Sequence, residues 1–187
     1  MKEIYKIGNQ IWQCFSSTET TFSNGDIIPL CKSNEDWLDY FNQKQPCCKI
    51  IMEKGIDTVF YNFFAANDNR GIGTNQFRVP TLQDHDLLIN SIGGWDQSNR
   101  SEILNEKLHF FNELNGNIDG KGNYVAKGLY GCWWIKANNS ESGFYGDHLP
   151  YNLSLCFAIN NKKFVESHWR RPTYKNFGYQ LRLIKNA

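Results

Sequence analysis

The sequence has no long apolar run and no excess of charge of either sign. No stretch approaches the roughly 18 to 20 uninterrupted apolar residues that a membrane helix needs. Residues 1–15 alternate polar and apolar side chains, where a signal peptide would have an apolar core. We therefore expect no membrane insertion and no export through such a signal. Lys and Arg number 20 against 19 Asp and Glu, which gives a net charge of +1. A nucleic-acid partner is not expected for a chain without a basic surplus.

The sequence also lacks the spacing of known metal and catalytic motifs. Its six cysteines form no CxxC pair, and its four histidines form neither an HxxxH nor an HExxH pattern. No GxSxG elbow surrounds a serine, and the glycine pairs at 71 and 73 and at 120 and 122 complete no phosphate-binding motif. We therefore predict no metal, no cofactor and no catalytic residue. The cysteines are interpreted as small buried hydrophobic residues or free thiols rather than as a disulfide framework.

The length and composition favour a single domain with an aromatic core. A chain of 187 residues can bury one substantial core and is awkward to divide between two, so we expect one domain over residues 1–187. Aromatic residues make up 15% of the chain. The polar remainder is rich in Asn, which favours loops and turns over helix interiors.

The N-terminal part of the chain carries signals for extended structure. Residues 4–15 alternate as a strand does and are interrupted by Gly8-Asn9, which predicts a hairpin. Ser33 can cap a short helix. Residues 57–62 are β-branched and aromatic, which is typical of a buried strand.

The clearest helix signal follows Pro80. Thr81 and Asp84 can form a capping box, and the apolar stripe that follows ends at Gly93-Gly94, where a positive φ is wanted. A second helix is expected from Ser101, and its polar faces indicate a peripheral position. The His85 side chain is interpreted as a surface or boundary residue.

The C-terminal half is predicted to be mostly β. Residues 115–123 are dominated by Gly and Asn and indicate a surface loop. Three runs after that loop are typical of strands, at residues 131–136, 153–159 and 177–184. Helices in the middle and strands at both ends predict an α+β fold in which the terminal strands pair.

One region, residues 136–176, has the composition of a recognition surface. Aromatic rings together with amides provide rigid contact area and adaptable hydrogen bonds, and they suit sugar rings. The alternative is an Asn-rich loop with no ligand, and composition alone does not separate the two. The candidate ligand-binding residues are Tyr145, His148, Tyr151, Asn152, Trp169 and Tyr174.

Five segments in order resemble the Fibrobacter succinogenes major paralogous domain, a family placed with the C-type-lectin-like folds. The segments are IGNQIW at 7–12, FYNFFAANDNRG at 60–71, FRVPT at 77–81, GCWW at 131–134 and FGYQLRLI at 177–184. The family usually has Trp-His where this chain has Phe77-Arg78, which is more similar to formylglycine-generating-enzyme and retroelement variable-protein domains. The calcium motifs of sugar-binding lectins and the paired cysteines of formylglycine chemistry have no counterpart here.

The resemblance implies a C-type-lectin-like fold with paired terminal strands, two flanking helices and a long loop region before the last strand. In ligand-display members of this fold, the exposed face is formed by the segment that leads to the last strand, which here contains the candidate residues. The core aromatic residues would be Trp12, Trp133, Trp134 and Phe177.

The resemblance also implies a function and a context. Family members are commonly exported to bacterial surfaces through a signal that this chain lacks, whereas related domains occur in bacteriophage virions made in the host cytoplasm. We therefore expect a non-enzymatic protein of a virion, associated with a tail or head fibre, that binds a host glycan, a host protein or another virion subunit, with a homo-oligomer left open. A bacterial surface protein is the alternative. A formylglycine-generating-like enzyme with Cys132 or Cys156 as the reactive thiol is the third.

Overall fold

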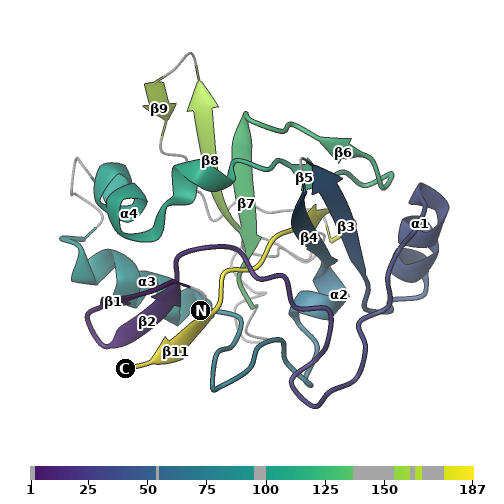
Figure 1. The fold of residues 1–187 in the computed structure, drawn as a ribbon, viewed down its shortest axis with the longest axis horizontal. Coiled ribbons are helices and arrows are strands. Elements are labelled where there is room, and N and C mark those ends of the chain that lie inside the picture. The colour runs from purple at the N-terminus through teal and green to yellow at the C-terminus, as the bar shows by residue number, and fades with distance from the viewer. Residues whose placement is uncertain (1–2, 54, 95–99, 137–153, 161–162, 166–174) are drawn as a thin grey trace, which may run out of the picture.

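The computed structural model describes residues 3–53, 55–94, 100–136, 154–160, 163–165 and 175–187, and within these it is a mixed α+β fold (Figure 1). This confirms the predicted α+β class. The helices are α1 (Asn34–Asn42), α2 (Phe63–Ala66), α3 (Leu82–Ser91), α4 (Arg100–Leu108) and the 3-10 helix η1 (Phe110–Glu113). The strands are β1 (Ile4–Ile7), β2 (Gln10–Gln13), β3 (Cys48–Glu53), β4 (Ile56–Asn62), β5 (Asn117–Ile118), β6 (Tyr124–Val125), β7 (Tyr130–Trp134), β8 (Ser154–Asn160), β9 (Lys163–Val165), β10 (Gly178–Tyr179) and β11 (Ile184–Asn186).

The first sheet joins the two ends of the chain in the order β1-β2-β11. The predicted hairpin is present, with Ile4 opposite Gln13, and Gly8 in its turn has a φ of 57°. Strand β11 pairs antiparallel with β2 and sets Ile184 opposite Trp12. Strands β1 and β11 therefore flank β2, with the chain starting opposite one end of β2 and finishing opposite the other, and the sheet lies next to α3 (Figure 1). The expected pairing of the terminal strands is confirmed.

The second sheet has the order β3-β4-β10-β5-β6 and is curled. Its far edge folds back toward β3 and β4. The Lys49 ammonium of β3 donates to the Gly122 carbonyl at 2.8 Å, and the ring of Phe60 in β4 lies 5.6 Å from that of Tyr124 in β6. The prediction of a surface loop over residues 115–123 was wrong in part. Strand β5 is completely buried, since Ile118 packs in the core and Asn117 accepts a hydrogen bond from the Tyr130 hydroxyl.

The segment between β10 and β11, residues 180–183, lies at the centre of the fold. Gln180 exchanges backbone hydrogen bonds with β7, while the carbonyls of Leu181 and Leu183 accept from Ser17 at 2.7 Å and Gln13 at 3.0 Å. The third sheet, β7-β8-β9, is linked through these bonds to the other two. The prediction of one strand over residues 177–184 was wrong. Strand β10 belongs to the second sheet and β11 to the first, and the residues between them hydrogen-bond to different segments one after another.

Capping places the helices as predicted. Ser33 caps α1 in a capping box with Asp36, and Thr81 caps α3 in a capping box with Asp84. After α3, Gly93 and Gly94 adopt φ values of 110° and 85°. Local hydrogen bonding therefore sets both helix starts, which is why the sequence alone locates them.

Two expectations for the helical region were wrong. Helix α4 includes the expected Ser101, but its Leu104 and Leu108 side chains are fully buried against α3 and the terminal sheet, so the helix is part of the core. His85 is 4% exposed rather than at the surface. Helix α4 is not peripheral because a short polar helix still buries the single apolar stripe that faces the core. His85 is buried because it lies one turn before Leu88 and Ile89 on the inner face of α3.

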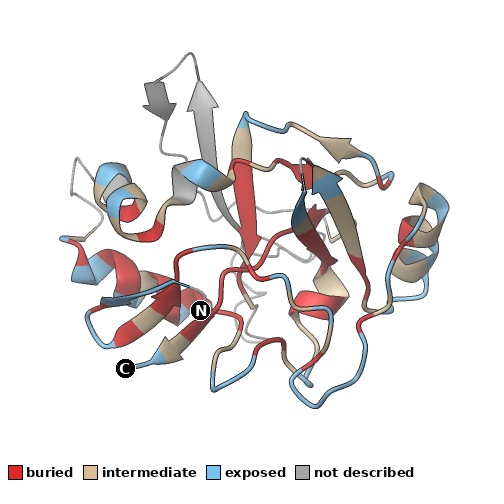
Figure 2. Cartoon of the chain, viewed as in Figure 1, coloured by how far each residue is buried: buried red, intermediate tan, exposed pale blue. Residues whose placement is uncertain are grey.

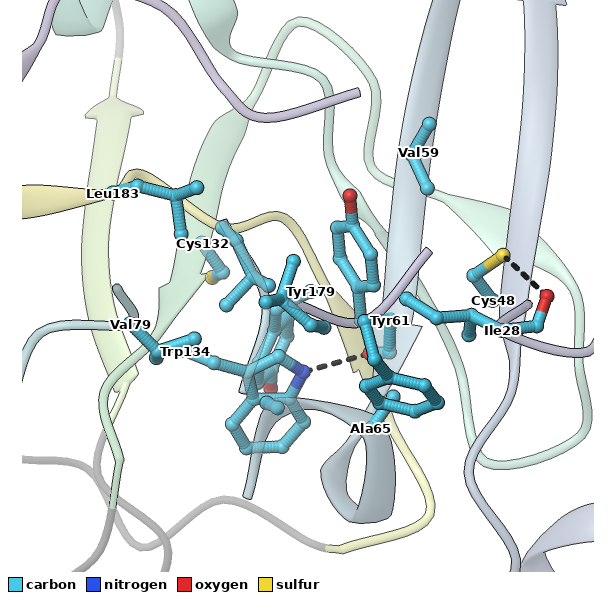
Figure 3. Packing of buried hydrophobic residues seen from close by; sticks show 14 residues of the cluster. Ile28, Cys48, Val59, Tyr61, Ala65, Val79, Cys132, Trp134, Tyr179 and Leu183 are labelled. Atoms are coloured by element: carbon cyan, nitrogen blue, oxygen red, sulfur yellow. Dashed lines mark hydrogen bonds between the residues drawn. The ribbon is translucent and has the colours of Figure 1, made fainter. Parts of the chain in front are cut away.

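The core is aromatic, and buried residues line the central strands (Figure 2). Trp12, Trp133 and Trp134 are buried as expected, and the half-buried Phe177 packs against the same core. The Trp134 indole donates to the Tyr61 carbonyl at 2.7 Å, which links β7 to β4 across the core (Figure 3). The tryptophans are thus hydrogen-bonded as well as packed.

Substitution of Asp84 by asparagine is expected to lower stability at neutral pH by about 1 kcal/mol. Burial raises the pKa of the Asp84 carboxyl, but hydrogen bonds from the Arg78 guanidinium and from Thr81 outweigh burial and leave the pKa below its usual value. Such a group stabilises the fold above a pH of about 4 and loses that contribution as the pH falls through the lowered pKa.

Urea denaturation at pH 7 and pH 3 measures this effect. The difference in stability between wild type and Asp84→Asn should be smaller at pH 3 than at pH 7. Asp57→Asn, at an exposed carboxylate of β4, is the matched control. An equal difference at both pH values would contradict the assignment.

Candidate functional site

The sequence-predicted ligand residues lie outside the described residues. Tyr145, His148, Tyr151 and Asn152 belong to residues 137–153, and Trp169 and Tyr174 belong to residues 166–174. The structure describes the residues that flank them: Lys136, after β7, and Lys175, before β10. The candidate site can therefore be examined where these two segments join the fold.

Next to Lys175 lies a cluster of half-buried phenylalanines, Phe41 of α1 with Phe63 and Phe64 of α2, here called the aromatic platform. The Phe63 and Phe64 rings meet edge to face with centroids 5.4 Å apart, and Phe41 lies 6.0 Å from Phe64. Phe63 also packs edge-on against buried Trp134 at 6.1 Å. The Lys175 ammonium lies 4.8 Å from the Phe63 ring centroid. Residues 166–174 therefore join the described fold directly beside the platform.

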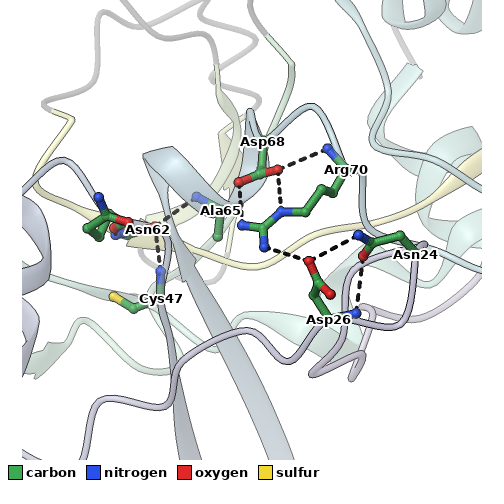
Figure 4. Close-up of polar contacts among 8 residues, drawn as sticks. Asn24, Asp26, Cys47, Asn62, Ala65, Asp68 and Arg70 are labelled. Atoms are coloured by element: carbon green, nitrogen blue, oxygen red, sulfur yellow. Dashed lines mark hydrogen bonds and ion pairs between the residues drawn. The ribbon is translucent and has the colours of Figure 1, made fainter.

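The platform is held in place by Asn62, the last residue of β4 and the N-cap of α2. Its side-chain oxygen accepts from the backbone of Ala65 at 2.9 Å and of Cys47 at 3.1 Å, and its amide donates to the Gln45 carbonyl at 2.8 Å (Figure 4). Asn62 is 1% exposed. One buried amide thus ties α2, which is only four residues long, to the connection between α1 and β3.

A second polar cluster lies after α2 and surrounds Arg70. Its guanidinium pairs with Asp68 at 2.8 Å and Asp26 at 3.0 Å (Figure 4). The same guanidinium lies 3.8 Å from the Phe22 ring centroid. The hydrogen bond from Arg70 lowers the pKa of Asp68 below its usual value. The pKa of Asp26 is lowered mainly by a hydrogen bond from Asn24 and, to a smaller extent, by one from Arg70. The cluster joins two loops through these contacts, and it keeps a net negative charge because one guanidinium faces two carboxylates.

The described cysteines are buried thiols, as predicted. Cys14, Cys31, Cys47, Cys48 and Cys132 are free and at most 3% exposed. A hydrogen bond with Cys31 and burial raise the pKa of the Cys47 thiol, and burial raises that of Cys48 to about 12. The side chain of Cys156 lies outside the described part of the chain. Cys132, at 2% exposure, lacks the solvent access of a reactive thiolate.

We expect the described thiols to resist alkylation in the folded protein. Incubation with iodoacetamide at pH 8 should leave Cys47, Cys48 and Cys132 unmodified in peptide mass mapping, because burial disfavours the reactive thiolate. The same residues should be modified completely in guanidinium chloride, which serves as the control. Rapid native-state alkylation of Cys132 would contradict this prediction and favour the formylglycine-generating-like enzyme.

Comparison with known proteins adds no identification: no family model, no curated protein and no solved structure matches this chain. Among the described residues, no group of three or more His, Cys, Asp and Glu side chains could hold a metal ion. No helix in that part of the chain is both long enough and apolar enough to cross a membrane.

Sequence reasoning missed the aromatic platform. The Phe-Phe pair at 63–64 belongs to the FYNFFAANDNRG segment that resembles the family, and that resemblance carries no information on surface exposure. The local signal was present, because Asn before a short apolar run is a favoured N-cap. Phe41 and Lys175 carry no such signal, since they reach the platform only through the tertiary fold.

Proposed function

We propose that this protein is a non-enzymatic recognition module that binds its ligand over the aromatic platform. The observation that carries the proposal is the platform itself: three half-buried phenylalanines, fixed by a buried amide and by Trp134, beside the point where residues 166–174 join the fold. Aromatic faces held rigidly at a surface lose little entropy on binding and are the common anchors of recognition sites.

The fold is proposed to be C-type-lectin-like and related to the Fibrobacter succinogenes major paralogous domain. Three features support this. The terminal strands pair in one sheet, and helices α3 and α4 pack against that sheet. The Gly-Cys-Trp-Trp sequence lies in strand β7, which is buried. Residues 137–153 and 166–174 precede the last strands, in the position of the display region of that fold.

The proposed context is a bacteriophage virion, where the module would be associated with a tail or head fibre and would contact a host glycan or protein. A bacterial surface protein is the alternative. Support for the virion comes from the resemblance together with the unpaired, buried cysteines among the described residues, since exported proteins usually oxidise their thiols.

Binding assays on platform variants test this function. Wild type and Phe64→Ala should be compared on a glycan array and in host-cell adsorption, with Phe15→Ala as the matched control because it removes a 41% exposed ring elsewhere, after β2. Phe64→Ala and Trp169→Ala are each expected to weaken binding about tenfold. Absence of wild-type binding in both assays, or full binding by Phe64→Ala, would refute the proposal.

A second candidate function is a structural virion subunit. The observation in its favour is the end of the β3–β4 hairpin, where Met52 and Ile56 are each 72% exposed, an arrangement typical of residues covered by a partner. Measurement of the solution mass, alone and with virion proteins, separates the two functions. A monomer without affinity for virion proteins would exclude the structural role.

A further inference from the structure

The sequence contains two Asn-Gly pairs, Asn24-Gly25 and Asn115-Gly116. Asparagine is one of the thermolabile residues of proteins, because its side-chain carbonyl carbon can be attacked by the backbone nitrogen of the residue that follows. Glycine in the following position has no side chain to shield that nitrogen. The attack also requires the asparagine side chain and the next peptide group to rotate toward one another. The fold therefore decides whether either pair reacts.

The first pair, Asn24-Gly25, has room to rotate. Both residues are exposed, in the loop that runs from Phe22 to Asp26. No atom of a more distant residue lies within 4 Å of the position that a Cβ at Gly25 would occupy. The Gly25 N–H donates to the Phe22 carbonyl at 2.9 Å, and the Asn24 side chain bonds to Asp26 at 3.0 and 3.1 Å. Because these bonds are local and exposed, they open at a low cost in free energy.

The second pair, Asn115-Gly116, is held by distant segments of the chain. The Asn115 amide donates to the Gln180 side-chain oxygen at 3.0 Å. Gly116 is buried, and its N–H donates to the Tyr130 carbonyl at 2.7 Å. A Cβ at Gly116 would lie only 2.0 Å from the Val125 carbonyl oxygen, so the surrounding backbone leaves no space for the peptide to turn. Reaction here would require the sheet around β5 to open.

We propose that Asn24 deamidates spontaneously in the folded protein, whereas the fold protects Asn115, and that the product loosens residues 22–26 from the loop after α2. This makes Asn24 a modification site at which the protein changes its charge with age. The inference is independent of the proposed recognition function.

The reaction needs only water as a second reactant. The Gly25 backbone nitrogen attacks Cγ of Asn24, so that an N–Cγ bond forms and the Cγ–Nδ2 bond breaks. The side-chain nitrogen leaves as ammonia and takes up the proton that the Gly25 amide has lost. Water then cleaves one of the two C–N bonds of the cyclic imide and returns a proton to the nitrogen. The product is aspartate or isoaspartate, and either one carries a new negative charge.

The new charge falls in the cluster around Arg70. The Asn24 amide donates to the Asp26 carboxylate at 3.0 Å, and the same carboxylate oxygen accepts from the Arg70 guanidinium at 3.0 Å (Figure 4). A carboxylate at position 24 cannot donate this hydrogen bond. It also becomes a third negative charge, with Asp26 and Asp68, around one guanidinium. The contact between the two loops is therefore expected to weaken.

Peptide mapping by mass spectrometry tests the site. Folded protein is incubated at pH 8 beside a sample in guanidinium chloride. In the folded protein, Asn24 should convert at least about tenfold faster than Asn115, because the buried pair reacts only after local opening. In the denaturant the two should convert at similar rates. Equal rates in the folded protein would overturn the proposal. So would a difference that persists in guanidinium chloride, because the neighbouring residues in sequence, and not the fold, would then protect Asn115.

The variant Asn24→Asp reproduces one product and tests its effect. Its thermal unfolding midpoint should fall by about 2–4 °C, the shift expected in a chain of this size for the loss of one hydrogen bond to a charged group. The Ser23 amide, which donates to the Gly71 carbonyl at 3.0 Å between the two loops, should exchange its hydrogen faster. Asn186→Asp makes the same change at an exposed residue of β11 and should alter neither quantity. An unchanged midpoint and unchanged exchange in Asn24→Asp would overturn the loosening of the loop.

Discussion

Replacement of Glu113 by alanine is expected to lower the free energy of unfolding by about 3–5 kcal/mol, because it leaves a buried positive charge without its partner. Arg182 is 1% exposed, and its guanidinium donates to the Glu113 carboxylate and to the Leu108 carbonyl. The same carboxylate accepts from the Ser16 backbone at 2.7 Å and from the Ser16 hydroxyl at 2.9 Å. Its loss therefore removes the partner of the cation and the anchor of the chain after β2.

Equilibrium unfolding in guanidinium chloride measures this effect, and two variants calibrate it. Glu102→Ala removes an exposed carboxylate of α4 and should change stability by less than about 0.5 kcal/mol. Glu113→Gln keeps an acceptor for Ser16 but removes the negative charge. Its decrease in the free energy of unfolding should therefore lie between those of Glu102→Ala and Glu113→Ala. A loss below about 1 kcal/mol for Glu113→Ala would contradict the importance of the pair.

Replacement of Trp134 by alanine is expected to lower the free energy of unfolding by about 3–5 kcal/mol, the usual range for a fully buried tryptophan. Trp134 is 0% exposed, its ring lies 4.6 Å from that of Tyr179, and its indole bonds the Tyr61 carbonyl. The ring also supports Phe63 of the aromatic platform. Any variant population that remains folded should therefore bind more weakly than wild type as well as unfold more easily.

Trp134→Phe divides the effect into its parts. Phenylalanine keeps most of the packing but cannot donate to the Tyr61 carbonyl, so its cost should be nearer about 1–3 kcal/mol. Thermal and chemical unfolding of both variants gives the comparison. Equal stability of wild type and Trp134→Ala would show that β7 and β4 are not joined through this residue.

Local features of the fold could be predicted, and features that depend on distant pairing could not. Signals that span only a few residues of sequence predicted three of these features: the capping box of Thr81 and Asp84, the turn at Gly8-Asn9 and the buried tryptophans. Strand β5 is only two residues long and is flanked by Gly and Asn, so nothing local distinguishes it from a loop. It is buried because it pairs with β10, which lies some 60 residues later in the sequence.

The candidate site divides in the same way. Composition indicated a recognition region at residues 136–176, and those candidates stay predictions because they lie outside the described residues. Phe41, Phe64 and Lys175 were not identified, since they come from distant parts of the chain and each is unremarkable in its own surroundings. The tertiary fold brings them together, through the contact of the Phe41 and Phe64 rings and the approach of Lys175 to Phe63.

The central position of residues 180–183 has a consequence for how the chain folds. These residues hydrogen-bond to β7, to the segment around Ser17 and to β2, and the strand that follows pairs with residues near the opposite end of the chain. The local pairings β1-β2, β3-β4, β5-β6 and β7-β8 do not need this segment, but the contacts that join the three sheets cannot form while the ribosome still holds it. Such a topology pairs residues far apart in sequence and implies slow and late folding, in which the sheets β1-β2-β11 and β3-β4-β10-β5-β6 are complete only when the last strands have been made.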